Sequence, residues 1–236
     1  DGIAHDAARF FRRASRLAVE NAALRVIACS GVLANPDESR ALRIAPRYGF
    51  AREHLAEWHA AQGHWQEAAR SFRQLLNTNA SPVYRLGLAE ALDARHQTAD
   101  AERERTKARD AMLAAQQGGA KDQFRPLALL YLEESNVAEG LRFARLDWEV
   151  RQDALAADTL AWAFFRNGQD AEAQNFARQA AQSGNKSPAL LLHSGMILCH
   201  AGDFVAGRAL IEQALACPLA FGAAERKLSA EARRVL

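Results

Sequence analysis

DTLAWAFFRNGQDAEAQNFARQAAQSGNKSP, residues 158–188, is the stretch that decides the fold. The stretch 193–218, HSGMILCHAGDFVAGRALIEQALACP, repeats its spacing of small residues, and a third copy begins at His54. In each copy a small residue is followed by a glycine seven positions later, then by another small residue and an apolar one. In chain order these positions are Ala56, Gly63, Ala68 and Leu75; Ala161, Gly168, Ala173 and Ala180; and Gly195, Gly202, Gly207 and Ala214.

Each copy predicts a hairpin of two antiparallel helices. The small residues let two helix backbones approach closely, and the glycine between the helices supplies the left-handed cap that ends the first one. A proline then stops the second helix, at Pro82, Pro188 or Pro218. A single hairpin is too small to bury its own apolar face, so the hairpins must stack.

This pattern resembles the tetratricopeptide repeat, whose unit has 34 residues. Ala161 and Gly195 lie 34 residues apart, and Trp65 and Phe204 occupy the aromatic position of the family after the hairpin turn. The resemblance covers roughly residues 41–221. It implies an all-α, right-handed superhelical solenoid of antiparallel helix pairs, with about five repeats and flanking helices.

Two of the repeats are degenerate. The second helix of one, roughly residues 99–115, carries many charges and only a thin apolar stripe. It ends at Gln117-Gly118-Gly119, the strongest internal loop or hinge signal. The next repeat begins near Asp122 and has no hairpin glycine. We expect Asn136 to adopt the left-handed conformation there, since asparagine tolerates it.

The chain is therefore expected to have three parts. They are N-terminal helices at residues 1–48, forming a degenerate repeat or a lid; repeats at 49–221; and a C-terminal capping helix at 222–236. The capping helix would place Leu228, Ala232 and Val235 on one face.

The composition excludes several classes of protein. Of 236 residues, 52 are Ala and only 17 are Val, Ile or Thr, which excludes a fold based on sheets. The net charge is +2, and no domain-wide basic footprint points to nucleic acid. The 26 Arg against 4 Lys indicate GC-rich coding, and we expect a bacterial source. No apolar run reaches the roughly 18 residues that would span a membrane.

The three cysteines, Cys29, Cys199 and Cys217, are odd in number and scattered, although one disulfide stays possible. This favours a reducing compartment, and so the cytoplasm, over a disulfide scaffold. The chain opens with Asp1, so we expect that a presequence or a larger upstream region has been removed. A removed presequence would leave the periplasm open as a location.

Catalytic and metal-binding patterns are missing from the sequence. There is no phosphate-binding glycine loop, no nucleophile elbow and no paired cysteine motif, so we expect neither enzyme activity nor a cofactor. The helical spacing of His54, His59 and His64 suits zinc poorly, and His193 and His200 lie two turns apart. The histidines are expected to be partly buried helix residues, and Cys199 is expected to be a core residue.

Four arginines, Arg9, Arg12, Arg13 and Arg16, follow one another at helical spacing near the start of the chain. They form either a solvated helix face or a contact for an acidic partner or anionic lipid.

The resemblance also implies a concave groove lined by the first helix of each repeat, where peptides bind. Mapped position by position, its inward residues are Glu53, Glu57, Tyr84, Leu88, Arg125, Leu129, Leu132, Asp158, Trp162, Phe165, Arg166, Leu192, Met196 and His200. Trp162, Phe165 and Arg166 share one helix face, and such residue types dominate binding hot spots. In the alternative interpretation, Trp162 and Phe165 pack against the neighbouring repeat.

The carboxylate clamp of the family is absent. It requires Lys and Asn at several groove positions, which hold Glu53, Glu57, Arg85, Asp122 and Pro126 here. A mixed groove, acidic at its start and apolar later, suits an amphipathic helix or a largely apolar peptide better.

We therefore expect a non-catalytic scaffold that binds a protein or peptide partner, with no nucleic acid and no membrane span. Two alternatives stay open. The chain is a structural module whose groove is filled by its own N-terminal helices, or it is an accessory or regulatory domain of a larger protein. The sequence leaves the oligomeric state and the identity of the partner open.

Overall fold

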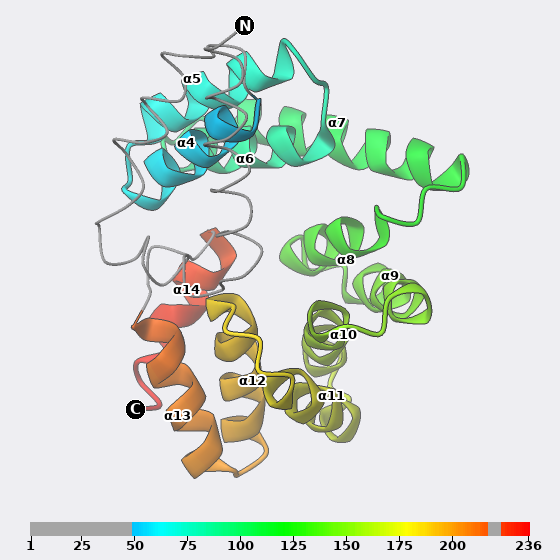
Figure 1. Cartoon of the computed structure of the whole chain (residues 1–236), viewed down its shortest axis with the longest axis vertical. Helices are drawn as coiled ribbons and strands as arrows, with labels where there is room; N and C mark the ends of the chain where they lie inside the picture. The colour runs from blue at the N-terminus through cyan, green and yellow to red at the C-terminus, as the bar shows by residue number, and fades with distance from the viewer. Residues whose placement is uncertain (1–48, 217–222) are drawn as a thin grey trace, which may run out of the picture. The chain divides into compact units, whose positions relative to one another are not determined.

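The computed structural model describes residues 49–216 and 223–236 (Figure 1). Within these residues the chain forms eleven helices, α4 to α14, and no strand. The expectation of an all-α fold is thereby confirmed. The expected N-terminal helices, the four-arginine stripe and the sites of Cys29 and Cys217 lie outside the described residues.

The chain divides into two compact units that meet within α7, between Ala108 and Arg109. The first unit contains α4 (Gly49–Ala61), α5 (Trp65–Leu76), α6 (Pro82–Asp93) and the first part of α7 (Thr98–Gln117). The second contains the rest of α7, α8 (Phe124–Glu133), α9 (Val137–Val150), α10 (Ala154–Arg166), α11 (Asp170–Gln182), α12 (Pro188–His200), α13 (Phe204–Leu215) and α14 (Ala223–Ala232).

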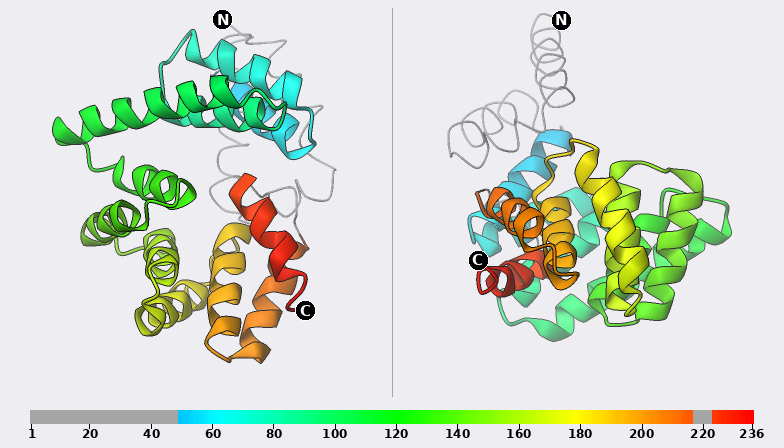
Figure 2. Two further views of the ribbon diagram at one scale, coloured as in Figure 1. Left: turned by 180° about the vertical axis from the view of Figure 1, so that it is seen from behind. Right: turned by 90° about the horizontal axis from the view of Figure 1, so that it is seen from below.

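In the second unit, successive helices pair as hairpins and the hairpins stack. Helix α8 packs on α9, α10 on α11, and α12 on α13, as Figures 1 and 2 show for the last two pairs. The first helices of the hairpins also contact one another, α8 with α10 and α10 with α12, and α12 contacts α14 in the same way. This is the arrangement of a helical repeat fold, in which each hairpin buries its apolar face against the next.

The hairpin turns follow the predicted glycines. Gly63, Gly168 and Gly202 have φ angles of +76°, +72° and +85°, in the left-handed region that residues with a side chain rarely adopt. Helix α7 ends at Gln117, and Gly119 has a φ of +93°, so the predicted break at 117–119 is a loop.

The prediction for Asn136 is wrong. Ser135 takes the left-handed conformation, with a φ of +61°, whereas Asn136 has a φ of −85°. The Asn136 side-chain oxygen instead accepts a hydrogen bond from the backbone N–H of Glu139 (3.4 Å) and caps α9. An asparagine oxygen is among the best N-cap acceptors, so the turn places this residue one position later, at the start of the helix.

Small residues lie at the helix crossings, as predicted. Ala161 and Ala173 are buried, with 1% and 0% of their surface exposed. Helices α12 and α13 approach closest at Gly195 and Gly207, where a Cβ atom on Gly207 would lie 2.8 Å from the Gly195 carbonyl oxygen. No side chain fits at that distance, so these glycines set the spacing of the hairpin.

Helix α14 packs against the last hairpin. Ala232 is fully buried, and Leu228 and Val235 pack against the core cluster formed around α12 and α13. None of the helices in the described part of the chain is long and apolar enough to cross a membrane.

Candidate binding face

Helix α10 carries two different faces. An Asp153 side-chain oxygen accepts hydrogen bonds from two backbone N–H groups of its first turn and starts the helix. On the core face Leu160, Ala161 and Phe164 are buried. On the other face Trp162 and Phe165 are half-buried and Arg166 is exposed. The expected division of the helix between core and surface is thus observed.

The three residues of the outer face contact one another. The ring centroids of Trp162 and Phe165 lie 5.3 Å apart, and the Arg166 guanidinium lies 5.8 Å from the Trp162 ring centroid. A guanidinium at this distance is attracted by the electron-rich ring face. The cluster therefore combines apolar surface with a positive charge.

Trp162 also stacks on the neighbouring repeat. Its ring lies 4.5 Å from the His193 ring of α12, with an angle of 12° between the planes. His193 Nδ1 lies 3.2 and 3.3 Å from the two carboxylate oxygens of Asp158, and both residues are buried. This pair joins α10 to α12 and holds the surface on which Trp162 rests, so Trp162 both packs against a repeat and offers its outer surface to solvent.

His200 extends the face at the end of α12. Its ring meets Phe165 edge-on at 5.1 Å, and its Nε2 lies 3.5 Å from an Asp170 carboxylate oxygen. More than half of each of these two polar side chains is exposed. Met196, one turn earlier, is half-buried against the core.

Helix α8 contributes Arg125 and Leu129, both half-buried. Arg125 Nε donates a hydrogen bond to the Thr159 hydroxyl oxygen (3.1 Å), and that hydroxyl donates to the Leu155 carbonyl (2.9 Å). Within residues 49–216 and 223–236, neither Arg125 nor Arg166 forms an ion pair with a carboxylate. We call the surface formed by Arg125, Leu129, Trp162, Phe165, Arg166, Met196 and His200 the α8–α10–α12 face.

The groove residues expected from the first unit form a separate, acidic patch. The Tyr84 hydroxyl on α6 donates a hydrogen bond to Glu53 Oε2 on α4 (3.1 Å), and Glu57 is exposed nearby. Burial and the two carboxylates raise the pKa of Tyr84. The structure therefore brings Glu53 and Tyr84 together as expected.

The assignment of Leu88 to the groove is wrong. It is only 4% exposed and belongs to the core cluster of the first unit, with Phe72 and Leu92. Leu132, Leu192 and Asp158 are buried as well, because each of their helices packs on its own hairpin partner and on at least one neighbouring first helix.

Sequence reasoning missed the part that His193 plays. It lies 35 residues after Asp158, close to one repeat length, and residues one repeat apart occupy neighbouring positions on adjacent first helices. That spacing could have predicted the contact between His193 and Asp158. Among the described residues no three histidine, cysteine, aspartate or glutamate side chains gather as a metal site would require.

Comparisons with known proteins concern the fold. No family model matches the chain. No curated protein sequence matches it either. Among solved structures, yeast Tom70 is similar with a TM-score of 0.50 and 13% identity, over 84% of this chain and 42% of that one.

A subunit of the Cut9–Hcn1 hetero-tetramer of APC/C is also similar, with a TM-score of 0.52 and 12% identity, over 84% of this chain and 38% of that one. This chain thus spans less than half the length of either protein. Both neighbours are tetratricopeptide-repeat proteins, and their low identity makes this a likeness of fold. The chain is thereby identified as an all-α helical repeat protein with a tetratricopeptide-repeat-like fold.

Proposed function

We propose that this chain is a non-catalytic protein-interaction scaffold whose α8–α10–α12 face binds a segment of a partner protein. The observation that carries the proposal is the cluster of Trp162, Phe165 and Arg166 on one side of α10. Tryptophan and arginine are the residue types most enriched in binding hot spots. Here they are accessible and held in place, which lowers the entropy that binding must overcome.

The surroundings of the cluster favour an amphipathic or largely apolar segment. Leu129 and Met196 add half-buried apolar surface on the neighbouring helices. Arg125 and Arg166 supply positive charge at two places. Of the nearby carboxylates, Asp158 is buried against His193, and Asp170 lies beside His200 at one end of the face. A helix with apolar residues on one side and acidic residues at its edge would complement this arrangement. The hetero-tetramer that Cut9 forms with Hcn1 is an example of the same fold in a protein assembly.

The test begins with capture from cells of the source organism. The wild-type chain, Trp162→Ala, Arg166→Ala and Arg103→Ala serve as bait, and the captured proteins are quantified by mass spectrometry. Arg103 is the control because it lies on α7 with an exposed side chain, and its one ion pair within the described part of the chain is with Asp100 of the same helix. A partner of the face is retained by wild type and by Arg103→Ala and is lost with the two other variants.

Calorimetry with the captured partner then gives the magnitude. Trp162→Ala should weaken binding by about 2 kcal/mol or more, roughly thirtyfold in Kd. Because Trp162 stacks on His193, its loss also removes packing, and Arg166→Ala serves as the variant that spares the core. Unchanged affinity in both variants, while both still melt cooperatively, would refute the proposal. An equal loss of affinity in Arg103→Ala would mean that the partner binds outside the α8–α10–α12 face.

A further inference from the structure

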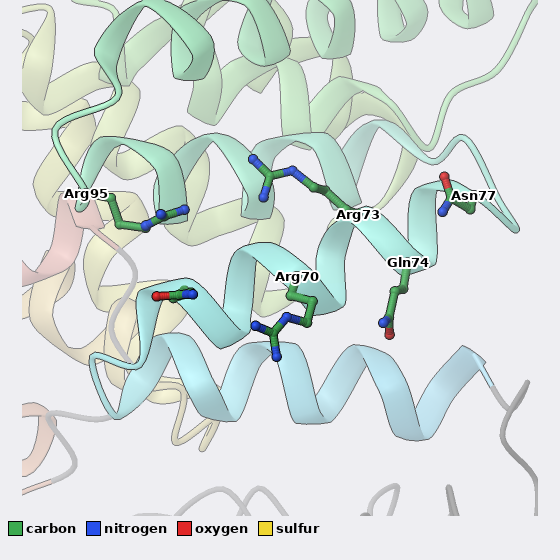
Figure 3. Close-up of a pocket in the computed structure, with 6 residues that line it drawn as sticks. Arg70, Arg73, Gln74, Asn77 and Arg95 are labelled. Carbon is green, nitrogen blue, oxygen red and sulfur yellow. The ribbon is translucent and has the colours of Figure 1, made fainter.

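A shallow hollow of about 320 Å³ lies on the first unit, beside α5 and the end of α6 (Figure 3). Its lining consists of three arginines and three side-chain amides and includes neither a carboxylate nor an aromatic ring. The six residues are Gln66, Arg70, Arg73, Gln74, Asn77 and Arg95. The hollow belongs to the first unit alone and shares no residue with the α8–α10–α12 face.

Among the described residues, the three arginines of the hollow have no acidic partner. Within residues 49–216 and 223–236, none of Arg70, Arg73 and Arg95 forms an ion pair. Two other arginines of the same unit are paired, Arg85 with Glu104 at 2.8 Å and Arg105 with Asp93. Three positive charges around one hollow repel one another, and an anion bound among them would relieve that repulsion.

Glu67, the acidic residue of α5, is not among the residues that line the hollow. Burial lowers the pKa of His59 on α4, and the negative charge of Glu67 acts in the opposite direction. Arg52, also on α4, donates a hydrogen bond to the Gln74 side-chain oxygen (2.8 Å), which orients the amide of Gln74 at the edge of the hollow.

The lining residues of α5 form one stripe along the helix. Gln66, Arg70, Arg73, Gln74 and Asn77 recur at helical spacing, and the stripe is about 16 Å long at 1.5 Å per residue. An extended peptide of about five residues has the same length. In Figure 3 the side chains of Arg73 and Arg95 extend toward each other, so the turn after α6 adds a third charge beside the stripe.

We propose that this hollow binds an extended acidic segment of a protein, whose carboxylates pair with Arg70, Arg73 and Arg95. Guanidinium groups bind carboxylates through two parallel hydrogen bonds, which makes arginine suited to this recognition. The side-chain amides of Gln66, Gln74 and Asn77 both donate and accept, as the main chain of a peptide requires. Single-stranded nucleic acid is disfavoured because no aromatic ring is present for bases to stack on.

The test uses fluorescein-labelled hexaglutamate and fluorescence anisotropy at low salt. We expect saturable binding that weakens as salt rises, because exposed charges are screened. The variant Arg70→Gln/Arg73→Gln/Arg95→Gln should lose about tenfold or more in affinity. The control Arg103→Gln/Arg142→Gln/Arg178→Gln removes the same net charge at exposed, ion-paired positions, and its affinity should change less than about twofold. Trp162→Ala should bind hexaglutamate like wild type.

Several outcomes would overturn the proposal. Equal losses of affinity in the two triple variants would mean that net charge alone attracts the peptide. If wild type did not bind hexaglutamate even at millimolar peptide, the proposal would be wrong. Inorganic phosphate or free glutamate competing as well as hexaglutamate would show a small-anion site instead. A labelled oligothymidylate that binds more tightly, with the same dependence on the three arginines, would assign the hollow to nucleic acid.

A measurement on wild type guards against misfolding of the triple variant. Arginine side-chain resonances are followed by NMR during titration with hexaglutamate. The resonances of Arg70, Arg73 and Arg95 should shift together and saturate at the dissociation constant found by anisotropy. Shifts confined to other arginines would contradict the assignment. Because the hollow and the α8–α10–α12 face share no residue, failure of either proposal leaves the other standing.

Discussion

Replacing Gly207 by alanine should destabilise the last hairpin, although alanine is the better helix former. A Cβ atom at this position would lie 2.4 Å from Cys199 Sγ, 2.8 Å from the Cys199 backbone nitrogen and 2.8 Å from the Gly195 carbonyl oxygen. The sulfur can rotate away, but the two backbone atoms can move only if α12 and α13 separate. The substitution therefore acts on the distance between two helices.

The expected magnitude is the difference between two opposing effects. Alanine gains about 1 kcal/mol over glycine in a helix interior. An extra methyl group in a well-packed core costs roughly 1–3 kcal/mol, and the two backbone contacts place this case at the upper end. The net loss is about 2 kcal/mol, which at roughly 2–4 °C per kcal/mol for a chain of this length lowers Tm by about 4–8 °C.

Circular dichroism melting and urea unfolding measure this difference. Val205→Ala is the control, because Val205 lies on the same helix and is 86% exposed, and it should change stability by no more than about 0.5 kcal/mol. The double variant Gly207→Ala/Cys199→Ala removes the sulfur and keeps both backbone contacts, so it should recover little. A Gly207→Ala chain as stable as wild type would refute the close crossing, and full recovery in the double variant would assign the spacing to the sulfur.

Two further predictions concern the core. Ala161→Leu and Ala173→Leu should each lower the free energy of unfolding by roughly 1–3 kcal/mol by overpacking. Ala171→Leu, at an exposed position of α11, should lower it little. Equal melting temperatures for the three variants would contradict the placement of Ala161 and Ala173 at helix crossings. Burial raises the pKa of Asp147 in the folded protein above its ordinary value of 3.8, despite the ion pair with Arg151. The folded state therefore holds this proton more tightly than the unfolded state does. The resulting stabilisation is fully present below pH 3.8 and is lost as pH rises through the folded pKa. Asp147→Asn should therefore melt higher than wild type at pH 7, with the difference shrinking toward pH 4, and a lower Tm at pH 7 would mean that the ion pair outweighs burial.

The hairpins were predictable because their determinants are local. In three of the hairpins a left-handed glycine ends the first helix and a small residue lies at the helix crossing, as at Gly168 and Ala173. Ser135 escaped prediction for the opposite reason. Any residue can adopt a positive φ at some cost, and the choice between Ser135 and Asn136 was decided by which of them caps α9.

The candidate site was predictable only in part. The helical spacing of Trp162, Phe165 and Arg166 was enough to place them on one face. Leu88 was misassigned because residues of α4, α5 and α7 pack into one core cluster with it, so this position at the edge of the expected outer face falls into the core. The boundary between the two units, after Ala108 in α7, could not be predicted from the sequence. No helix-breaking residue marks it, because Ala108 is a buried residue within the apolar stripe of the helix.

The α8–α10–α12 face depends on the same contacts that stack the repeats. Trp162 rests on His193, and His193 is held by Asp158, so a polar pair between α10 and α12 supports the half-buried tryptophan of the cluster. A change in the spacing of these two helices would tilt the tryptophan ring as well as weaken the stack. The repeat spacing, which the small residues set, thereby also sets the shape of the surface that we propose binds a partner. The choice of such a partner would depend instead on exposed residues such as Arg166, whose type the fold does not constrain.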